Sequence, residues 1–197
     1  MSCRQCSLPP SHCACAERPR ISSRCEFALL LHPKEQARPT NTGRFLAQSL
    51  AGTPCFSWHR TEPDPALAAW LAERPGQTFI LFPVDRPELE NRRAPRSQFT
   101  ALRAPRLLLL DGTWKEVRKM LRKSPGLAPF PLLSLEEQTP SRYSLRRGAG
   151  ADQLCTLESA AQVLRMLGEE PEAQALEAFT AHFCRRYRAF KSSHPPP

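Results

Sequence analysis

The sequence predicts an α/β fold built on a mostly parallel β-sheet. Short apolar runs alternate along the chain with segments of helical periodicity, which is the pattern of strands joined by helices. The 21 prolines lie mostly between these segments, so they argue against a long helical bundle. No internal repeat interrupts the alternation.

Length and composition indicate one compact domain with a small appendage. The chain has 197 residues, of which 41% are hydrophobic and 24% are charged, as expected for a folded protein rather than a disordered one. The longest apolar run, Ala66 to Ala72, is far shorter than the roughly 18 residues that a membrane span needs. The chain opens without the apolar segment of a secretory signal, so we expect a cytoplasmic protein.

The first half of the chain is expected to form two strands, two helices and a loop. These are strand 27–31, helix 43–50, helix 65–73, strand 78–82 and a long surface loop at 85–105. His32-Pro33 ends the first strand. Asn41 or Thr42 is suited to cap the first helix, and Pro65 suits the first turn of the second. The loop is predicted from its many charges and its prolines.

The second half is expected to contain two strands and three helices. These are strand 107–110, helix 114–123, strand 131–135, helix 156–167 and a final amphipathic helix marked by Leu176, Phe179, Phe183 and Tyr187. Gly168 is expected to end helix 156–167. The domain boundaries follow: a cysteine module at 1–20, the main domain at 21–191 and a flexible tail at 192–197.

Four of the eight cysteines lie within the first fifteen residues, in the pattern C-x2-C-x6-C-x-C formed by Cys3, Cys6, Cys13 and Cys15. Four thiolates this close can close a tetrahedral metal site, and zinc is its usual occupant. His12 is an alternative ligand, and a redox-sensitive tail without metal is the alternative to the whole site. The remaining cysteines, Cys25, Cys55, Cys155 and Cys184, lack ligand spacing and are expected to be small buried residues.

A carboxylate is expected at the carboxyl end of strand 107–110, where ligands bind in open α/β sheets. Asp111 follows this strand directly, and Gly112 allows a ligand to approach the backbone closely. Thr113 and Glu116 have the spacing of a capping box, which fixes the start of helix 114–123. Asp111 is therefore a candidate functional residue near a helix N-terminus. The alternative is that Asp111 only caps the helix.

Helix 114–123 is expected to carry a continuous basic face. Its cations fall at helical spacing, at Lys115, Arg118, Lys119, Arg122 and Lys123. Like charges so close repel each other by roughly a few tenths of a kcal/mol per pair, so the face suggests a track for a phosphate backbone. The net charge of +9 agrees with a nucleic-acid partner. The alternative is an ordinary solvated surface.

The segment Asp111-Gly112-Thr113-Trp114 matches the D-x-T-W signature of DTW-domain proteins. The cysteine pattern also resembles that family, and the resemblance covers roughly residues 3–190. Further matches follow in order along the chain: His32-Pro33-Lys34-Glu35, Asn41-Thr42-Gly43-Arg44, Lys119-Met120, Lys123-Ser124-Pro125, Ser141-Arg142-Tyr143 and Leu154-Cys155-Thr156-Leu157-Glu158.

This resemblance implies a tRNA-uridine aminocarboxypropyltransferase. Such enzymes move the 3-amino-3-carboxypropyl group of S-adenosylmethionine onto a uridine ring nitrogen and release methylthioadenosine. The family's fold is similar to that of SPOUT-type proteins, with helices on both sheet faces and a C-terminal trefoil knot at the cofactor site. For bacterial members the target lies in the variable loop of tRNA.

The residues of this chain then receive expected roles. Asp111 is the expected base that takes the proton of the uridine imide. Gly112, Thr113 and Trp114 are expected to bind S-adenosylmethionine, with Trp114 against its methionine portion or, alternatively, serving only as a core anchor. Residues at the start of helix 156–167 complete the expected cofactor-binding set: Leu154 and Thr156. The alternative is that this helix start is an ordinary N-cap.

Two alternative functions share these features. A SPOUT-like RNA methyltransferase would use the same cofactor and the same RNA, and would leave S-adenosylhomocysteine instead of methylthioadenosine. A non-catalytic, zinc-bearing RNA-binding protein would not bind S-adenosylmethionine at all. The expected partner in every case is RNA, and for the transferase it is tRNA. We expect no association with a membrane and no obligatory protein partner.

Overall fold

A computed structural model describes residues 2–135, 141, 143, 145 and 154–195. The chain divides into two compact units. The first, unit 1, comprises Met1–Ser22, Pro39–Ala51 and Glu137–Pro197. The second, unit 2, comprises Ser23–Arg38 and Gly52–Glu136 and contains the whole β-sheet.

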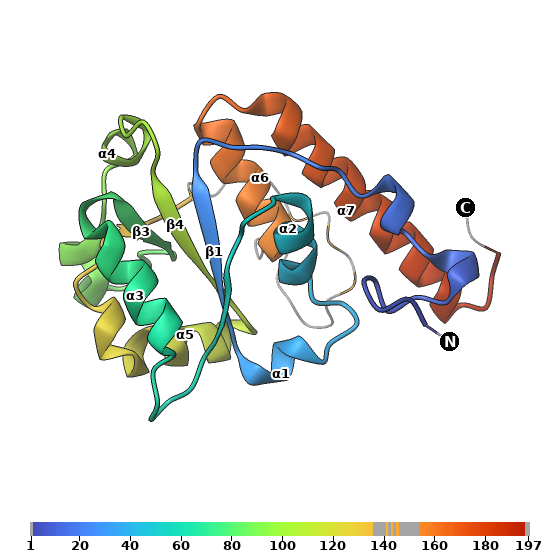
Figure 1. The fold of residues 1–197 in the computed structure, drawn as a ribbon, viewed down its shortest axis with the longest axis horizontal. Coiled ribbons are helices and arrows are strands. Elements are labelled where there is room, and N and C mark those ends of the chain that lie inside the picture. Colours follow the sequence, from blue (N-terminus) through green and yellow to red (C-terminus); the bar gives the residue numbers. More distant parts are fainter. Residues whose placement is uncertain (1, 136–140, 142, 144, 146–153, 196–197) are drawn as a thin grey trace. The chain divides into compact units, whose positions relative to one another are not determined.

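Unit 2 is an α/β structure around a five-stranded sheet in the order β2-β1-β4-β3-β5. The three longest strands, β1, β4 and β3, are labelled in Figure 1. All four strand pairings are parallel, which confirms the fold class predicted from the sequence. The strands are β1 (Glu26–Leu31), β2 (Cys55–Ser57), β3 (Thr78–Leu81), β4 (Arg106–Asp111) and β5 (Leu132–Leu133). The short β2, which borders an exposed turn, has no counterpart in the prediction because three residues carry too little pattern.

The strand order places a topological switch point between β1 and β4. From β1 the chain leads to β2 at one edge of the sheet, and from β4 it leads to β5 at the opposite edge. Adjacent strands whose connections leave in opposite directions open a crevice at their carboxyl ends, where α/β proteins bind ligands. The register pairs Leu31 with Asp111, so both strands end at the same level.

Two helices of unit 2, α3 (Pro65–Glu73) and α5 (Trp114–Lys123), pack on the same sheet face (Figure 1). Alternate strand residues such as Leu30, Ile80 and Leu108 form a core with Trp70 and Met120 from these helices. The opposite sheet face is buried as well. Burial on both faces explains why the strands are continuously apolar. The short helix α1 (Pro33–Gln36), just after β1, was not expected.

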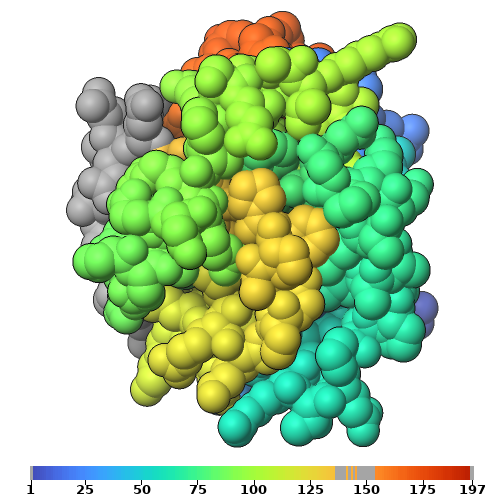
Figure 2. All heavy atoms as spheres, turned by 90° about the vertical axis from the view of Figure 1, so that its left-hand side faces the viewer, coloured from blue at the N-terminus to red at the C-terminus, as the bar shows by residue number. Residues whose placement is uncertain are grey.

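The predicted loop at 85–105 is wrong in part, because this segment contains the 3-10 helix η4 (Pro87–Arg92) and the helix α4 (Arg96–Thr100). Arg92 donates hydrogen bonds to the carbonyl oxygens of Leu127 and Phe130, at 2.7 and 2.9 Å. These bonds tie the segment to the chain that follows α5, as the adjoining green and gold atoms show (Figure 2). The side chain of Phe99 is fully buried against Phe79, which explains why a charged segment is ordered.

Unit 1 is helical. It contains α2 (Gly43–Ser49), α6 (Thr156–Met166), α7 (Glu170–Lys191) and two 3-10 helices, η1 (Pro10–His12) and η2 (Cys15–Glu17). Gly168, with φ of 80°, ends α6 as predicted and lets α7 fold back beside it (Figure 1). The ring of Phe45 in α2 packs against those of Phe179 and Phe183 in α7. Asn41 supplies the capping acceptor of α2, although Thr42 holds the N-cap position.

The predicted trefoil knot depends on the chain path through residues 136–140, 142, 144 and 146–153, which lie outside the described residues. Arg142 and the last two prolines of the tail lie outside them too. The knot and the domain boundaries therefore stay predictions. Among the described helices, none has the length and apolar character needed to cross a bilayer. Three of the four scattered cysteines are buried as expected, but the prediction was wrong for Cys55, which is exposed.

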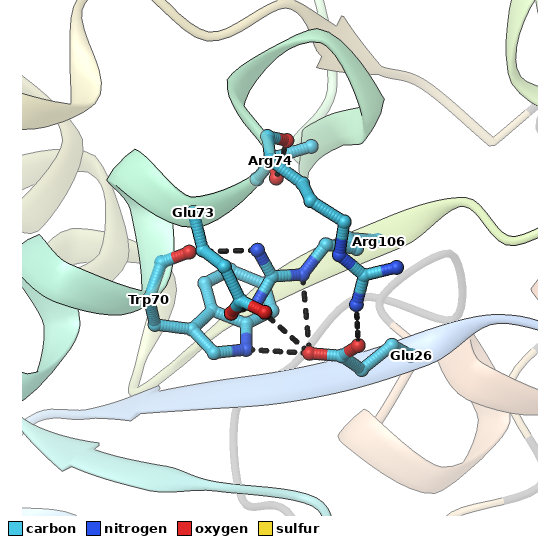
Figure 3. A network of polar contacts seen from close by, with 6 residues as sticks. Glu26, Trp70, Glu73, Arg74 and Arg106 are labelled. Carbon is cyan, nitrogen blue, oxygen red and sulfur yellow. Dashed lines mark hydrogen bonds and ion pairs between the residues drawn. The ribbon is translucent and has the colours of Figure 1, made fainter.

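The amino ends of β1 and β4 are joined by a charge network around the buried Arg106 (Figure 3). Arg106 is fully buried, and its guanidinium donates two hydrogen bonds to Glu26 Oε1 and one to the carbonyl oxygen of Trp70. The guanidinium also lies 3.9 Å from the centre of the Trp70 ring, whose Nε1 donates to the same Glu26 oxygen. Arg74 pairs with the second Glu26 oxygen. Burial raises the pKa of Glu26, but the hydrogen bonds outweigh it and the pKa lies below its ordinary value.

Removing the guanidinium should destabilise unit 2. Arg106→Ala leaves Glu26 and the Trp70 carbonyl without their main partner, and breaking a buried pair costs about 3–5 kcal/mol. Because the Glu26 side chain is 35% exposed, we expect the lower end of that range in urea unfolding. Glu73→Gln is the control, since its side chain is 64% exposed and its pairing should contribute under about 1 kcal/mol. An Arg106→Ala protein as stable as the wild type would contradict this role.

Candidate active site

The carboxyl ends of β1 and β4 bring His32 and Asp111 together. Asp111 is the last residue of β4, and His32 directly follows β1. The His32 backbone N–H donates to the Asp111 carbonyl oxygen at 2.9 Å, which continues the strand pairing by one more bond. Asp111 is only 3% exposed. The structure therefore places the predicted carboxylate at the switch point of the sheet.

The start of α5 is capped by Thr113 and not by Asp111. The Thr113 hydroxyl accepts a hydrogen bond from the Glu116 N–H, and Glu116 Oε2 accepts from the Thr113 N–H at 2.9 Å. This is the capping box that the sequence predicted. Asp111 lies two residues before the N-cap, so capping α5 does not explain a carboxylate at this position.

Gly112 has a packing reason that the sequence did not reveal. A Cβ atom at this position would lie 3.2 Å from Glu116 Cβ and 3.4 Å from Val117 Cγ2. The first turn of α5 therefore packs directly over the Gly112 backbone, and a side chain would push the helix away from the end of β4. The absence of a side chain at Gly112 thus lets α5 lie close to Asp111. This role is separate from the close approach of a ligand that the sequence suggested.

Trp114, the first residue of α5, carries a hydrogen-bond donor without an acceptor. Its Nε1 is buried, and no described residue accepts from it. The ring packs edge-on against Phe82, with centroids 6.4 Å apart, so Trp114 also anchors the helix. A buried, unsatisfied donor is costly, at about 1–3 kcal/mol. Such a donor beside the switch point is suited to meet an acceptor group of a bound ligand.

His32 is a site residue that the sequence indicated only as the end of strand 27–31 and as part of a family match. Its ring stacks on Trp58, with centroids 5.4 Å apart, and its Nδ1 accepts from the Lys34 N–H at 3.4 Å and lies 3.5 Å from Glu116 Oε1. Burial lowers the pKa of His32; Glu116 raises it, and Lys34, Lys119 and Arg38 lower it further. The imidazole is thus neutral near pH 7, with Nδ1 as an acceptor. A histidine directly after an apolar strand was the available signal.

Glu116 serves both the cap and the histidine. Burial raises the pKa of Glu116, but the hydrogen bonds from the Thr113 N–H and hydroxyl outweigh it and lower the pKa below its ordinary value. The carboxylate is therefore charged near neutral pH. Glu116 fixes α5 through Thr113, and its other oxygen lies 3.5 Å from His32 Nδ1, where its negative charge favours protonation of the ring.

The predicted basic face of α5 is exposed except at Arg118. Lys115, Lys119, Arg122 and Lys123 are exposed, whereas Arg118 is partly buried. Arg118 pairs through both terminal nitrogens with the carboxylate of Asp85. Lys119 Nζ lies 5.8 Å from the centre of the Trp58 ring, close to His32. Four of the five predicted cations are thus exposed on this helix, and the fifth is engaged within unit 2.

The remaining expected cofactor residues lie in unit 1, at the start of α6. Leu154 is half-buried and Thr156 is buried. The Thr156 N–H donates to the Thr42 hydroxyl at 3.2 Å, and Glu158 accepts from the Cys155 N–H at 2.8 Å in a second capping box. These donors of the helix N-terminus are therefore already used within unit 1.

The four N-terminal cysteines form a compact cluster. Their sulfur atoms all lie within 4.8 Å of one another, with Cys3 and Cys15 3.7 Å apart and Cys6 and Cys13 3.6 Å apart. A tetrahedral Zn²⁺ with Zn–S bonds of about 2.3 Å holds its sulfurs about 3.8 Å apart, so the cluster fits a metal ion. Hydrogen bonds from the Cys6 and Gln5 backbone lower the pKa of Cys3 to about 6.

His12 does not belong to this cluster. One ring nitrogen contacts the Ser11 hydroxyl at 2.9 Å, and the other contacts the His194 carbonyl oxygen at 3.0 Å. Arg44 of α2 donates to the Cys6 carbonyl oxygen and to the Ser7 hydroxyl, which places a positive charge beside the thiols. The four cysteines alone therefore form the candidate metal site among the described residues.

The His32 ring should titrate below its ordinary pKa. In an NMR titration its midpoint should lie below 6.5, and Glu116→Gln should lower it further because the nearby negative charge is lost. Since unfolded His32 takes up its proton at higher pH than folded His32, this group should reduce stability as the pH falls below 6.5. The exposed carboxylate of Glu62 provides the control, Glu62→Gln. A midpoint at or above 6.5, or no response to Glu116→Gln, would refute this environment.

Comparison with known proteins shows the family of this chain. The sequence model of the DTW domain matches residues 1–188. The chain is 28% identical over 198 residues to the tRNA-uridine aminocarboxypropyltransferase 2 of Drosophila melanogaster, and the match covers 94% of this chain and 74% of that protein. No solved structure matches the chain. Because the family match spans both units and includes the segment from Asp111 to Trp114, this chain belongs to the DTW domain family.

Proposed function

We propose that this chain modifies tRNA by transferring the 3-amino-3-carboxypropyl group of S-adenosylmethionine to a uridine, with release of methylthioadenosine. The observation that carries the proposal is the site at the carboxyl ends of β1 and β4, where the D-x-T-W segment meets His32. The family match and the printed name of the Drosophila relative support the same reaction.

The reaction is a substitution at carbon. The uridine N3 attacks the γ-carbon of the aminocarboxypropyl group, a C–N bond forms, and the C–S bond breaks as the sulfonium takes its electron pair and becomes a thioether. The proton on N3 must leave, because the protonated imide is a weak nucleophile. Asp111 is the proposed acceptor of that proton. The site selects the γ-carbon over the methyl group by presenting it to the uridine.

The residues beside Asp111 are proposed to hold the two substrates. The unsatisfied Trp114 Nε1 is suited to donate to the carboxylate or a ribose hydroxyl of S-adenosylmethionine. Gly112 and Thr113 set the distance between α5 and the end of β4. Leu154 and Thr156 remain in the proposed cofactor-binding set on the strength of the resemblance, although the Thr156 N–H already has an acceptor in Thr42.

The exposed cations of α5 are proposed to contact the phosphate backbone of tRNA. Lys115, Lys119, Arg122 and Lys123 extend along the helix from its start near Asp111, so RNA bound there would bring a nucleotide close to the carboxylate. Arg118 is proposed to contribute in part, since Asp85 already neutralises much of its charge.

The identity of the products tests the reaction class. Purified protein incubated with S-adenosylmethionine and unmodified tRNA should give methylthioadenosine and a uridine nucleoside heavier by one aminocarboxypropyl group in mass spectrometry. S-adenosylhomocysteine with a methylated nucleoside would instead indicate a methyltransferase. RNA binding without any binding of S-adenosylmethionine in calorimetry would indicate a non-catalytic protein.

Asp111→Asn should abolish most of the turnover. The amide keeps the shape of the side chain but no longer accepts a proton, and loss of a positioned base costs roughly 10²–10⁴-fold in rate. Affinities for tRNA and S-adenosylmethionine should change only a few-fold, and a thermal melt checks the fold. The matched control is Asp64→Asn at the N-cap of α3, where asparagine caps as well as aspartate. Near wild-type turnover of a folded Asp111→Asn protein would exclude Asp111 as the base.

The metal of the cysteine cluster is proposed to be one structural Zn²⁺ per chain. Elemental analysis of the purified protein should return close to one equivalent of zinc, and acid should release it because the ligands are thiolates. Cys6→Ser should lower the zinc content, while the control Cys55→Ser, at an exposed cysteine outside the cluster, should not. Iron in place of zinc, or well under one equivalent of metal, would contradict the proposal.

A further inference from the structure

The last four turns of α7 carry cations and no carboxylate. After Glu177 the sequence contains no acidic residue, whereas arginine or lysine stands at positions 185, 186, 188 and 191. Arg185, Arg188 and Lys191 follow each other at a spacing of three residues, so they lie on one side of the helix. All three are exposed, and within the described part of the chain no carboxylate pairs with them.

Arg186 differs from these three and shows what a structural arginine looks like here. It is partly buried, donates to His182 Nε2 at 3.0 Å, and lies 3.8 Å from Glu17 of η2. Its partners hold the helix to the N-terminal segment of unit 1. Arg185, Arg188 and Lys191 have no such partners, and three unpaired cations on one side of a helix repel each other.

An exposed aromatic ring lies beside the last of these cations, Lys191. Phe190 is 39% exposed, and among the described residues no other large hydrophobic side chain is as exposed. Lys191 Nζ lies 5.9 Å from the centres of both the Phe190 and the Tyr187 rings. A single exposed phenylalanine is ordinary on a protein surface. An exposed ring beside a cation is instead a combination that binds unpaired nucleotides, because a base stacks on the ring while the cation contacts a phosphate.

The cysteine cluster supports this end of α7. The loop between Cys6 and Cys13 contains η1, whose His12 ring packs against Phe190 with centroids 5.9 Å apart and contacts the His194 carbonyl oxygen. Glu17 of η2, beyond the last cysteine, contacts His182 at 3.4 Å. A metal ion in the cluster would therefore fix the segment against which Phe190 rests.

We propose that the end of α7 and η1 form a second RNA-binding surface, made of His12, Arg185, Arg188, Phe190 and Lys191, which we name the α7 surface. An unpaired base of the RNA stacks on Phe190, Lys191 contacts the phosphate beside that base, and Arg188 and Arg185 contact phosphates further along the RNA backbone. The inference rests on the proposed function, which makes tRNA the RNA concerned. This surface lies in unit 1 and involves none of the residues proposed to contact RNA on α5.

Two variants separate stacking from charge. Phe190→Ala should weaken tRNA binding about 5- to 100-fold in filter-binding assays with little change in the salt dependence, because a stacked base is lost but no phosphate contact. Phe190→Tyr keeps an aromatic ring and should restore most of the affinity. Arg188→Ala with Lys191→Ala should reduce the slope of log affinity against log salt by about 0.7–0.9 for each lost phosphate contact.

The controls keep the inference distinct from the proposed function. Arg60→Ala with Arg103→Ala removes two exposed arginines of unit 2 outside the α5 face and should leave the affinity and slope near those of the wild type. Binding of S-adenosylmethionine should be unchanged in every variant. If the wild type forms the modified uridine and the α7 variants bind tRNA as the wild type does, the α7 surface is refuted and the reaction stands.

Two further outcomes would overturn the α7 surface. A wild-type protein that binds no tRNA would remove the proposed function together with this inference. Variants that bind tRNA normally but lose binding to phosphatidylserine vesicles would assign the surface to an anionic membrane instead of RNA. The loss of tRNA affinity in Phe190→Ala, recovered in Phe190→Tyr, is the result that supports it.

Discussion

Six consecutive residue pairs align β1 with β4, from Glu26 opposite Arg106 to Leu31 opposite Asp111. This pairing determines both ends of the sheet. At the amino ends it brings Glu26 to the buried Arg106. The Arg106 guanidinium also contacts Trp70 and Glu73. At the carboxyl ends it brings His32 to Asp111. A one-residue slip would separate both pairs, so the charge network also holds the register on which the candidate site depends.

The elements of the fold were predictable where the pattern is local. Apolar runs located the strands, and the spacing of Thr113 and Glu116 located the start of α5 and its capping box. The predictions failed where the information is distant in sequence. The segment 85–105 is ordered by Arg92 bonding to Phe130 and by Phe99 packing on Phe79, contacts that no local pattern encodes. The short strand β2 escaped because its three residues carry too little pattern, and the exposure of Cys55, its first residue, escaped with it.

The candidate site shows the same division. Asp111 was predicted because a carboxylate directly after an apolar strand is visible in the sequence. The approach of His32 to Glu116 joins residues 84 positions apart, and it follows only once β1 is paired with β4. The basic face of α5 was predicted from spacing alone, and spacing gave no sign that Asp85 would engage Arg118. Charge periodicity thus identifies the cations but not which of them are free to bind RNA.

The proposed reaction requires S-adenosylmethionine to bind at the carboxyl ends of β1 and β4. Hydrogen exchange at single amides, with and without saturating S-adenosylmethionine, measures this directly. We expect slower exchange at His32, Gly112 and Thr113, and no change at the amino ends of the same strands near Glu26 and Arg106. Binding of S-adenosylmethionine that slows exchange elsewhere and leaves those three amides unchanged would contradict the account.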